Sequence, residues 1–198
     1  QPRSRGLGDV YKRQGEAVIS AARNGHLGMV IYLHEHCAYL SICNDSALQE
    51  SVKNRHLKVV EYLLDHNANV HVEDDECIIV SAERGYLDIM NCLVKYGANA
   101  HINNGEALQI SAERGYLDIV RYLIELKVVI ESNIQWTVQV IAEKGHLDVL
   151  ECFDEYNIIP VNSYDLILVS AAANGHLDIV KYAIEHGALS PYRSSFEP

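Results

Sequence analysis

The nine residues SAERGYLDI occur twice in this chain, at Ser81–Ile89 and again at Ser111–Ile119, thirty positions apart. A catalytic site needs one set of groups in one place. An identical stretch at a fixed interval instead indicates a fold that stacks copies of one unit. The interval is therefore the feature that most restricts what this chain can become.

The interval extends along almost the whole chain. Glycines lie at multiples of thirty residues, with Arg55 in the remaining slot, and we call these six positions the turn anchors: Gly25, Arg55, Gly85, Gly115, Gly145 and Gly175. A leucine always follows two positions later, and an aliphatic residue always precedes the anchor by seven. This predicts six repeats, at 15–44, 45–74, 75–104, 105–134, 135–164 and 165–190.

Each repeat contains two helical patterns separated by its anchor. In the fourth repeat, Ala107–Ala112 carries a small or apolar face, and Ile119–Ile124 has apolar residues at helical spacing. Glycine at the anchor suits a left-handed turn between the helices. Asp118 lies in the first turn of the second helix, where a carboxylate suits the helix dipole. We expect Asp45, Asp75 and Asp165 to cap the first helices.

One unit of this size exposes its apolar stripe to water unless a neighbour covers it. Stacked copies bury each stripe against the next, so stability grows with the number of interfaces. The predicted fold is all-α, a helix-turn-helix solenoid of six repeats with short loops.

Composition narrows the functional classes. The net charge of −11 argues against general nucleic-acid binding, which needs Lys and Arg to neutralise phosphates. No apolar run is long enough to span a membrane, and no signal-peptide pattern is visible. The five cysteines, three of them in predicted helices, favour a reduced intracellular protein.

The two ends of the chain do not follow the repeat. Residues 1–14, QPRSRGLGDVYKRQ, match nothing later in the chain and resemble the translation of a sequencing adapter. We interpret them as a non-native segment, the alternative being a genuine basic arm. Residues 191–198 are a tail or the start of a truncated repeat, which would make the chain a fragment of a longer array.

The pattern of two short helices, GHLDIV, an aliphatic run and then Gly97-Ala98 or Gly187-Ala188 resembles the ankyrin repeat. The period is shorter than the family's 33 residues, and the family's T-P-L-H motif is replaced, for example by Glu106–Gln109. Short repeats of this kind are similar to ankyrin arrays of giant DNA viruses and some protists. The resemblance implies short loops with little β-hairpin, a protein-binding role, and a host-cytoplasmic location for a viral protein.

Chemistry-bearing motifs are weak, and we expect no enzyme, cofactor or metal. Four histidines occupy the slot after the anchor, a slot that also accepts Tyr86 and Tyr116, so their role is predicted to be structural. The HEHC stretch at His34–Cys37, with Cys43 nearby, has donors for zinc but no standard spacing, and an exposed helix end is the alternative. No nucleophile elbow, P-loop or H-E-x-x-H motif is present.

The resemblance to ankyrin arrays implies a protein partner on the concave face, bound by loop tips and first-helix ends. The residues placed there are charged pairs before the anchors, loop-tip residues and a single tryptophan: Glu83, Arg84, Glu113, Arg114, Glu143, Lys144, Glu73, Asp74, Asn103, Tyr164 and Trp136. The pairs would form charged ladders, with simple solvated charge as the alternative. Trp136 is either an exposed anchor for a partner or packed on a neighbouring loop.

We therefore predict a non-enzymatic interaction scaffold, a monomer whose protein partner carries a basic surface, with no nucleic acid and no membrane. Two alternatives remain. The chain is a structural spacer from a longer array, or it is the substrate-recruiting arm of a ubiquitin-ligase adaptor.

Overall fold

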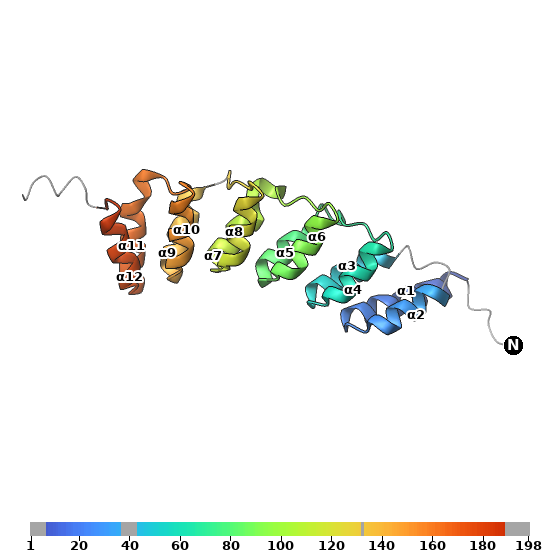
Figure 1. Cartoon of the computed structure of the whole chain (residues 1–198). Helices are drawn as coiled ribbons and strands as arrows, with labels where there is room; N and C mark the ends of the chain where they lie inside the picture. The colour runs from blue at the N-terminus through green and yellow to red at the C-terminus, as the bar shows by residue number, and fades with distance from the viewer. Residues whose placement is uncertain (1–6, 37–42, 132, 189–198) are drawn as a thin grey trace, which may run out of the picture. The chain divides into compact units, whose positions relative to one another are not determined.

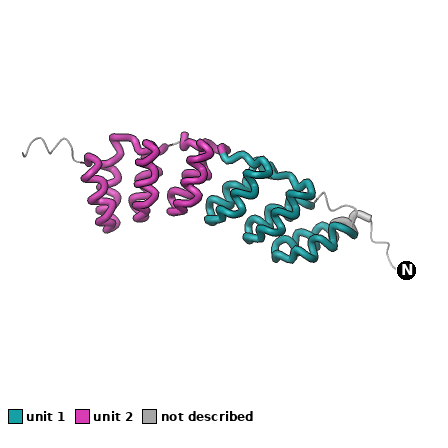
Figure 2. The backbone as a smooth tube through the Cα atoms, viewed as in Figure 1, with its two compact units in different colours: residues 1–100 teal, residues 101–198 magenta. Residues whose placement is uncertain are grey.

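A computed structural model gives the fold of residues 7–36, 43–131 and 133–188, with the side chains of residues 7–12 and 14 left aside. The chain divides into two compact units, residues 1–100 and 101–198 (Figure 2). The described residues form helices and turns and contain no strand. The all-α prediction is confirmed, and within each unit helical hairpins lie side by side (Figure 1).

Unit 1 contains the first three hairpins, in which a first and a second helix alternate. Their bounds are α1 Leu7–Arg23, α2 Leu27–His36, α3 Asn44–Lys53, α4 Leu57–Asp65, α5 Glu76–Arg84 and α6 Leu87–Lys95. The first helices α1, α3 and α5 pack on one another in sequence, as do the second helices α2, α4 and α6. The helix α1 begins within the segment that we interpret as non-native.

Unit 2 contains the other three hairpins, together with two short 3₁₀ helices. The bounds are η2 Ile102–Gly105, α7 Glu106–Glu113, α8 Leu117–Glu125, α9 Ile134–Lys144, α10 Leu147–Glu155, η3 Val161–Ser163, α11 Tyr164–Asn174 and α12 Leu177–Glu185. The helix α9 packs between α7 and α11, and α8 packs on α10.

The turn at each anchor is left-handed, which explains its glycine. Gly115 has φ 76°, and the Tyr116 amide donates to the Ser111 carbonyl five residues back, which closes the first helix in a Schellman-type turn. Arg55 takes the same conformation at φ 59°, a strained one for a residue with a Cβ. The second helices end the same way, with left-handed Gly97 and Gly187 and with left-handed non-glycine residues at Asn67, Lys127 and Asn157.

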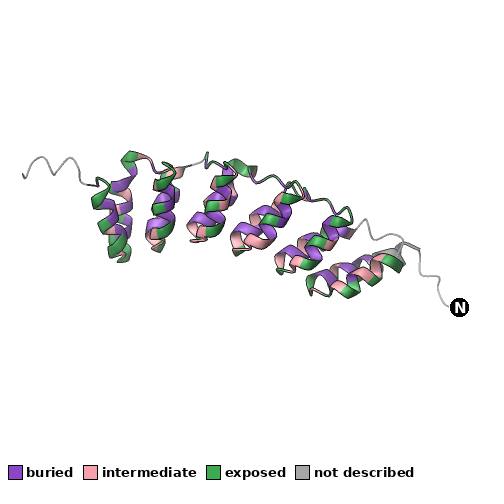
Figure 3. Ribbon diagram, in the orientation of Figure 1, coloured by how far each residue is buried: buried purple, intermediate pink, exposed green. Residues whose placement is uncertain are grey.

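The core is the apolar stripe that the period predicts, and it lies between the helices (Figure 3). At the position seven residues before the anchor, Leu48, Ile78 and Val138 are completely buried. Phe153, which takes the place of a leucine in other repeats, is also completely buried. Among the described residues, no helix is both long and apolar enough to cross a bilayer.

The capping prediction for the aspartates is wrong. Asp45 lies inside α3, where its Oδ1 accepts a hydrogen bond from the Asn69 amide at 2.7 Å. Asp75 is left-handed, and its Oδ1 accepts from His71 Nδ1 at 2.9 Å and from the Asn99 amide at 3.2 Å. Each carboxylate thus ties its own helix start to the loop that follows the second helix. Asp75 does occupy the N-cap position of α5, but its side chain makes no capping hydrogen bond. Asp165 lies within α11, whose N-cap is Ser163.

Candidate protein-binding surface

The predicted charged pairs lie where the first helices end. Those of unit 2 are on the neighbouring helices α7 and α9, with Glu113 and Glu143 half-buried and Arg114 and Lys144 exposed. Gln109 Nε2 donates to Glu113 Oε1 at 2.8 Å, and Gln139 Nε2 donates to Glu143 Oε1 at 2.8 Å. The glutamates are therefore partly held along their own helices.

Unit 1 has a corresponding pair at the end of α5, where Glu83 is half-buried and Arg84 is exposed. Earlier in this unit, Arg23 replaces the acidic residue, and its Nε lies 2.7 Å from Glu50 Oε2 of α3. The position that is acidic in repeats 3–5 is therefore basic in the first repeat.

Trp136 is exposed in the first turn of α9. Its side chain retains 47% of its accessible surface, while its backbone amide donates to the Asn133 side chain at 3.3 Å. Asn133 thus caps α9 and orders the turn that carries the indole. An indole that is half open to solvent on an ordered helix start can contact another molecule at little entropic cost.

The loop tips before α5 and α7 adopt a conformation that the sequence analysis did not foresee. Glu73, Asp74 and Asp75 are three consecutive left-handed residues, and Asn103, Asn104 and Gly105 repeat this geometry. Asn, Asp and Gly are the residues that tolerate it best. Glu73, Asp74 and Asn103 are exposed, so the structure leaves these predicted contact residues accessible.

Two of these loop tips carry further polar contacts. A side-chain hydrogen bond between Glu73 and Glu76 lowers the pKa of Glu73 and raises the pKa of Glu76. Asn103 Nδ2 donates to Glu106 Oε2 at 2.7 Å.

Tyr164 is not a loop-tip residue. It begins α11, is 8% exposed, and donates its Oη–H to Asp154 Oδ1 at 2.6 Å. Burial, together with this carboxylate, raises the pKa of Tyr164 to about 12. The ring stacks on His186 with the centroids 5.8 Å apart, so little of Tyr164 is accessible to a partner.

Apolar loop residues of unit 2 were missed by the sequence analysis. Val129 is 64% exposed, Val161 is 89% exposed and Tyr156 is 42% exposed. At the positions of Val129 and Val161, earlier loops carry polar side chains: Asn69 and Asn99, and His71 and His101. The interruption of that polar pattern is the sequence signal that could have identified them.

Val129 and Tyr156 border a cleft of about 400 Å³, which we call the loop cleft. Its lining is apolar except for Lys127 and Asn157, and it includes Val129, Tyr156, Ile130, Ile134 and Ile158. Ile134 and Trp136 belong to the same first turn of α9. An apolar cleft with exposed aromatic and aliphatic residues at its border is suited to receive an apolar side chain.

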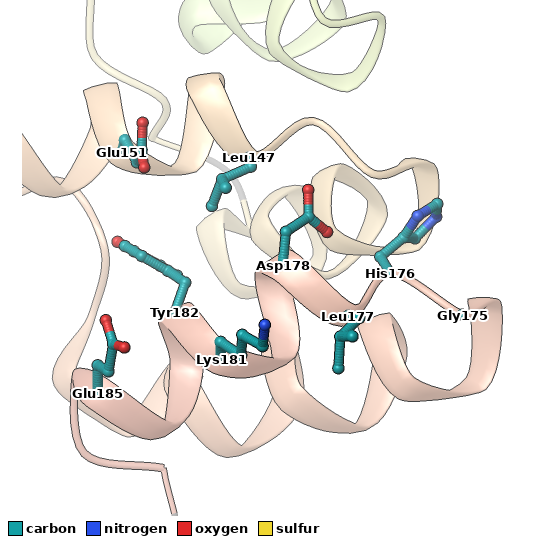
Figure 4. A pocket seen from close by; sticks show the side chains of 9 residues that line it. All are labelled: Leu147, Glu151, Gly175, His176, Leu177, Asp178, Lys181, Tyr182 and Glu185. Carbon is teal, nitrogen blue, oxygen red and sulfur yellow. The ribbon is translucent and has the colours of Figure 1, made fainter.

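A second concavity, of about 590 Å³, lies between α10 and α12 (Figure 4). Three carboxylates, Glu151, Asp178 and Glu185, line it with one basic side chain, Lys181. Tyr182 also lines it, and burial raises the pKa of this phenol. The groove is acidic, so a basic segment complements it better than an acidic one.

The histidines after the anchors join one repeat to the repeat before it. His56 Nε2 lies 2.9 Å from the Arg23 carbonyl, and His176 Nε2 lies 2.9 Å from the Glu143 carbonyl. Because a carbonyl only accepts, Nε2 carries the proton in both. This is the structural role predicted for the slot.

The HEHC histidines also have local partners. His36 Nδ1 lies 2.8 Å from the Tyr32 carbonyl, and His34 Nδ1 lies 3.1 Å from Tyr62 Oη. Burial and the charge of His66 lower the pKa of His34. Cys37 lies outside the described residues, and among those that are described no group of three potential ligands could hold a metal ion.

The buried cysteines behave as core residues. Cys77 is 2% exposed, and burial raises its pKa to about 12. Burial also raises the pKa of Cys92 to about 11, and it raises the pKa of Cys152 as well. Thiols held in this way are poor nucleophiles at neutral pH.

Comparison with known proteins decides the family. A family model described as ankyrin repeats (3 copies) matches residues 6–74 and 77–158, most of the chain. The chain belongs to the ankyrin repeat family. A search of curated proteins found no match. The crystal structure of the human ASB11 ankyrin repeat domain is similar, with a TM-score of 0.69 and 18% identity, over 86% of this chain and 83% of that chain. At that identity the likeness concerns the fold alone.

Ankyrin repeats are in general modules for protein–protein interaction, and the family is in general a non-enzymatic scaffold. The hairpins described above are thus short ankyrin repeats, a fold that in general binds other proteins. Which of the exposed surfaces binds is a separate question, since the family alone does not select one.

Proposed function

We propose that this ankyrin array is a non-enzymatic scaffold that binds a protein partner through the loops and first-helix ends of repeats 4 and 5. The partner inserts an apolar side chain into the loop cleft and contacts Trp136. The charged pairs Glu113-Arg114 and Glu143-Lys144 then set the orientation of the partner on the concave side.

The observation that carries this proposal is the exposure of apolar side chains in loops whose counterparts are polar. Val129 and Val161 stand where earlier loops have Asn and His, and they are 64% and 89% exposed. Val129 follows α8 and Val161 follows α10, so two successive loops each expose a valine. Exposing such residues is unfavourable in water, so these loops are suited to be covered by another molecule. Trp136 adds an aromatic residue of the kind that dominates binding energy.

Charge supports a basic partner. The chain has a net charge of −11, and the groove between α10 and α12 is lined by three carboxylates and one lysine. Opposite charge on the partner speeds association and selects among partners more than it adds affinity. We accordingly expect binding that weakens as salt increases.

We further propose that binding takes place inside a cell, in the host cytoplasm if the gene is viral. Four free cysteines among the described residues support a reducing compartment: Cys43, Cys77, Cys92 and Cys152. The resemblance of the short repeats to viral and protist arrays remains a hypothesis.

Two other functions are alternatives. As a structural spacer, the chain would have no partner at these loops, and replacing Trp136, Glu113 and Arg114 by alanine would change no binding. As the recruiting arm of a ubiquitin-ligase adaptor, it would bind a substrate through the same surface, so the adaptor role is a special case of the scaffold.

The test is a pull-down from host-cell lysate with three immobilised baits. They are the parent chain, a Val129→Asp/Trp136→Ala variant, and an Ile184→Asp control. Ile184 is 40% exposed on the second helix α12, so its replacement changes exposed apolar surface away from the loops. We expect a protein that the parent and the control retain, that the double variant loses, and that salt releases. Equal retention by all three baits, measured after purification of the captured protein, would contradict the proposed site.

A further inference from the structure

The loop between α8 and α9 runs as an extended chain along one wall of the loop cleft. Val128 and Ile130 are buried, at 4% and 8% exposed. Val129 between them is 64% exposed, and Glu131 is exposed as well. Burial that alternates with a period of two is the pattern of a β-strand that packs one face on a core.

One edge of this extended chain is covered by the loop before it. A Cβ on Gly105 would clash with the Val129 carbonyl oxygen, the nearest atom to it, so this carbonyl points at the Gly105 backbone. The Glu131 amide donates to the Asn104 carbonyl at 3.2 Å. In an extended chain the N–H and C=O groups of alternate residues point to the same edge, so Val129 and Glu131 both face the loop at 103–105.

The opposite edge is open, and Ile130 forms it. The peptide bond between Val129 and Ile130 is trans, so the Ile130 N–H points away from the Val129 carbonyl and hence away from Gly105. No described residue exchanges a backbone hydrogen bond with the N–H or C=O of Ile130. Ile130 also lines the loop cleft, whose lining continues through residues 156–158 of the next loop. A backbone donor and acceptor therefore lack a protein partner beside an apolar cleft.

The next loop does not supply that partner. Among the described residues, no backbone hydrogen bond joins 127–131 to 156–163, whereas Glu131 is joined to Asn104 of the loop before. Pro160, which stands at the position of Ile130 in the following repeat, has no N–H to donate. Residues 128–131 are thus paired with a loop on one side only.

The open edge has a charge of opposite sign at each end. Lys127 precedes it and lines the cleft, and Glu131 ends it; both side chains are exposed. A segment that lies along this edge is complementary when it places a carboxylate beside Lys127 and a basic residue beside Glu131. Charge therefore fixes which way the segment runs, once the sense of the pairing is chosen.

We propose that the partner adds an extended segment to residues 128–131 as an antiparallel strand. This rests on the proposed function and specifies the form of the partner at the loop cleft. The segment residue opposite Ile130 accepts from the Ile130 N–H and donates its own N–H to the Ile130 carbonyl. Its side chain lies on the same face as that of Ile130 and enters the cleft.

The sequence pattern of the segment follows from this geometry. Antiparallel pairs are slightly more stable than parallel ones, so the segment runs from Glu131 towards Lys127. From its N-terminus it has a basic residue, an apolar residue opposite Ile130, any residue, an apolar residue opposite Val128, and an acidic residue. The two apolar side chains face the cleft, because side chains alternate between the two faces of a strand.

A phage-displayed library of random twelve-residue linear peptides is the probe. Peptides are selected on the parent chain, and those that the Val129→Asp/Trp136→Ala variant also retains are discarded. The remaining peptides bind at the loops, and we expect them to share the five-residue pattern. A library that yields no peptide of this kind would contradict the proposed binding site itself, and the segment with it.

Methylation of single backbone nitrogens in a selected synthetic peptide separates strand addition from insertion of a side chain alone. Methylation at the residue opposite Ile130 removes the N–H that the Ile130 carbonyl accepts, and should weaken binding about tenfold or more in calorimetric titration. Methylation of the next residue is the matched control, because its N–H points away from the array, and it should change affinity by less than about twofold. The bound peptide should also slow hydrogen exchange of the Ile130 amide.

A charge exchange tests the direction of the segment. Lys127→Glu/Glu131→Lys keeps the net charge and alters only exposed side chains. It should weaken a selected peptide about fivefold, and a peptide with its two end charges exchanged should recover the affinity. Equal losses at neighbouring methylated positions, or an affinity that the charge exchange leaves unchanged, would overturn the strand while the loop site itself stands.

Discussion

Replacing Gly145 by alanine tests why the anchors are glycine. Gly145 has φ 80°, and a left-handed alanine costs about 1–2 kcal/mol more than glycine. In addition, its Cβ would lie 2.6 Å from Cε1 of the His176 ring. The ring must then move and lose the 2.9 Å bond from Nε2 to the Glu143 carbonyl, a loss of about 0.5–1.5 kcal/mol.

Gly175 provides the matched control. It has the same φ of 80°, but a Cβ there would meet nothing within 4 Å. Gly175→Ala should therefore cost only the backbone part, about 1–2 kcal/mol. Gly145→Ala should cost about 1.5–3.5 kcal/mol, the sum of the backbone part and the lost histidine contact.

The assay is urea unfolding followed by far-UV circular dichroism at micromolar concentration, with the m-values compared among variants. A Gly145→Ala/His176→Ala pair, compared with His176→Ala alone, gives the cost of the alanine without the ring. That cost should fall to the value found for Gly175→Ala. Equal costs for the two single glycine variants would refute the argument that the neighbouring ring, and not φ alone, requires glycine.

Four further perturbations have expected outcomes. Phe153→Ala, at a completely buried position, should cost about 3–5 kcal/mol in urea unfolding, through lost burial and the cavity left behind. Because burial lowers the pKa of His146, the folded chain binds fewer protons than the unfolded one, so stability falls as pH decreases through about 6.5. His146→Tyr should weaken the dependence of the urea unfolding midpoint on pH in this range. Cys77, with its pKa raised to about 12, should react with iodoacetamide at pH 8 only once urea unfolds the chain, which peptide mapping detects. Tyr164→Phe should cost about 1–3 kcal/mol in urea unfolding, because Asp154 loses a donor while partly buried.

The period of the sequence predicts the hairpins and their core because residues at equal places in each repeat meet the same neighbours. It places Leu48, Ile78 and Val138 in one stripe, and all of them are buried. It also identifies the left-handed turns, including the strained one at Arg55. These features depend on spacing alone, which a single sequence displays.

Contacts between loops were harder to foresee. Asp45 and Asp75 look like caps in the sequence, but they accept from amides twenty-four residues away, because the loop after the second helix returns to the start of the first. Tyr164 occupies a loop position in the repeat pattern, but its partner Asp154 has no equivalent in the other repeats. The loop cleft is likewise formed by two successive loops, and the residue pattern does not predict the backbone path of either loop.

At four of the anchors a ring from the next repeat lies over the anchor residue. Where the covering residue is His56, His146 or His176, the anchor beneath it is glycine, and a Cβ there would lie within 2.6 Å of the ring. Where the anchor is Arg55, the covering residue is Tyr86, and the guanidinium lies 5.1 Å from the ring centroid.

Arg55 also lies beside Asp88, with Nε and Oδ2 3.7 Å apart. The cation–π contact and this exposed ion pair are each worth about 0.5–1 kcal/mol at most, comparable to the left-handed strain of a residue with a Cβ. These two contacts can therefore offset part of the strain of the left-handed Arg55. A histidine at position 86 would lack the larger ring face that Arg55 covers, so substitutions at the two positions should not be additive.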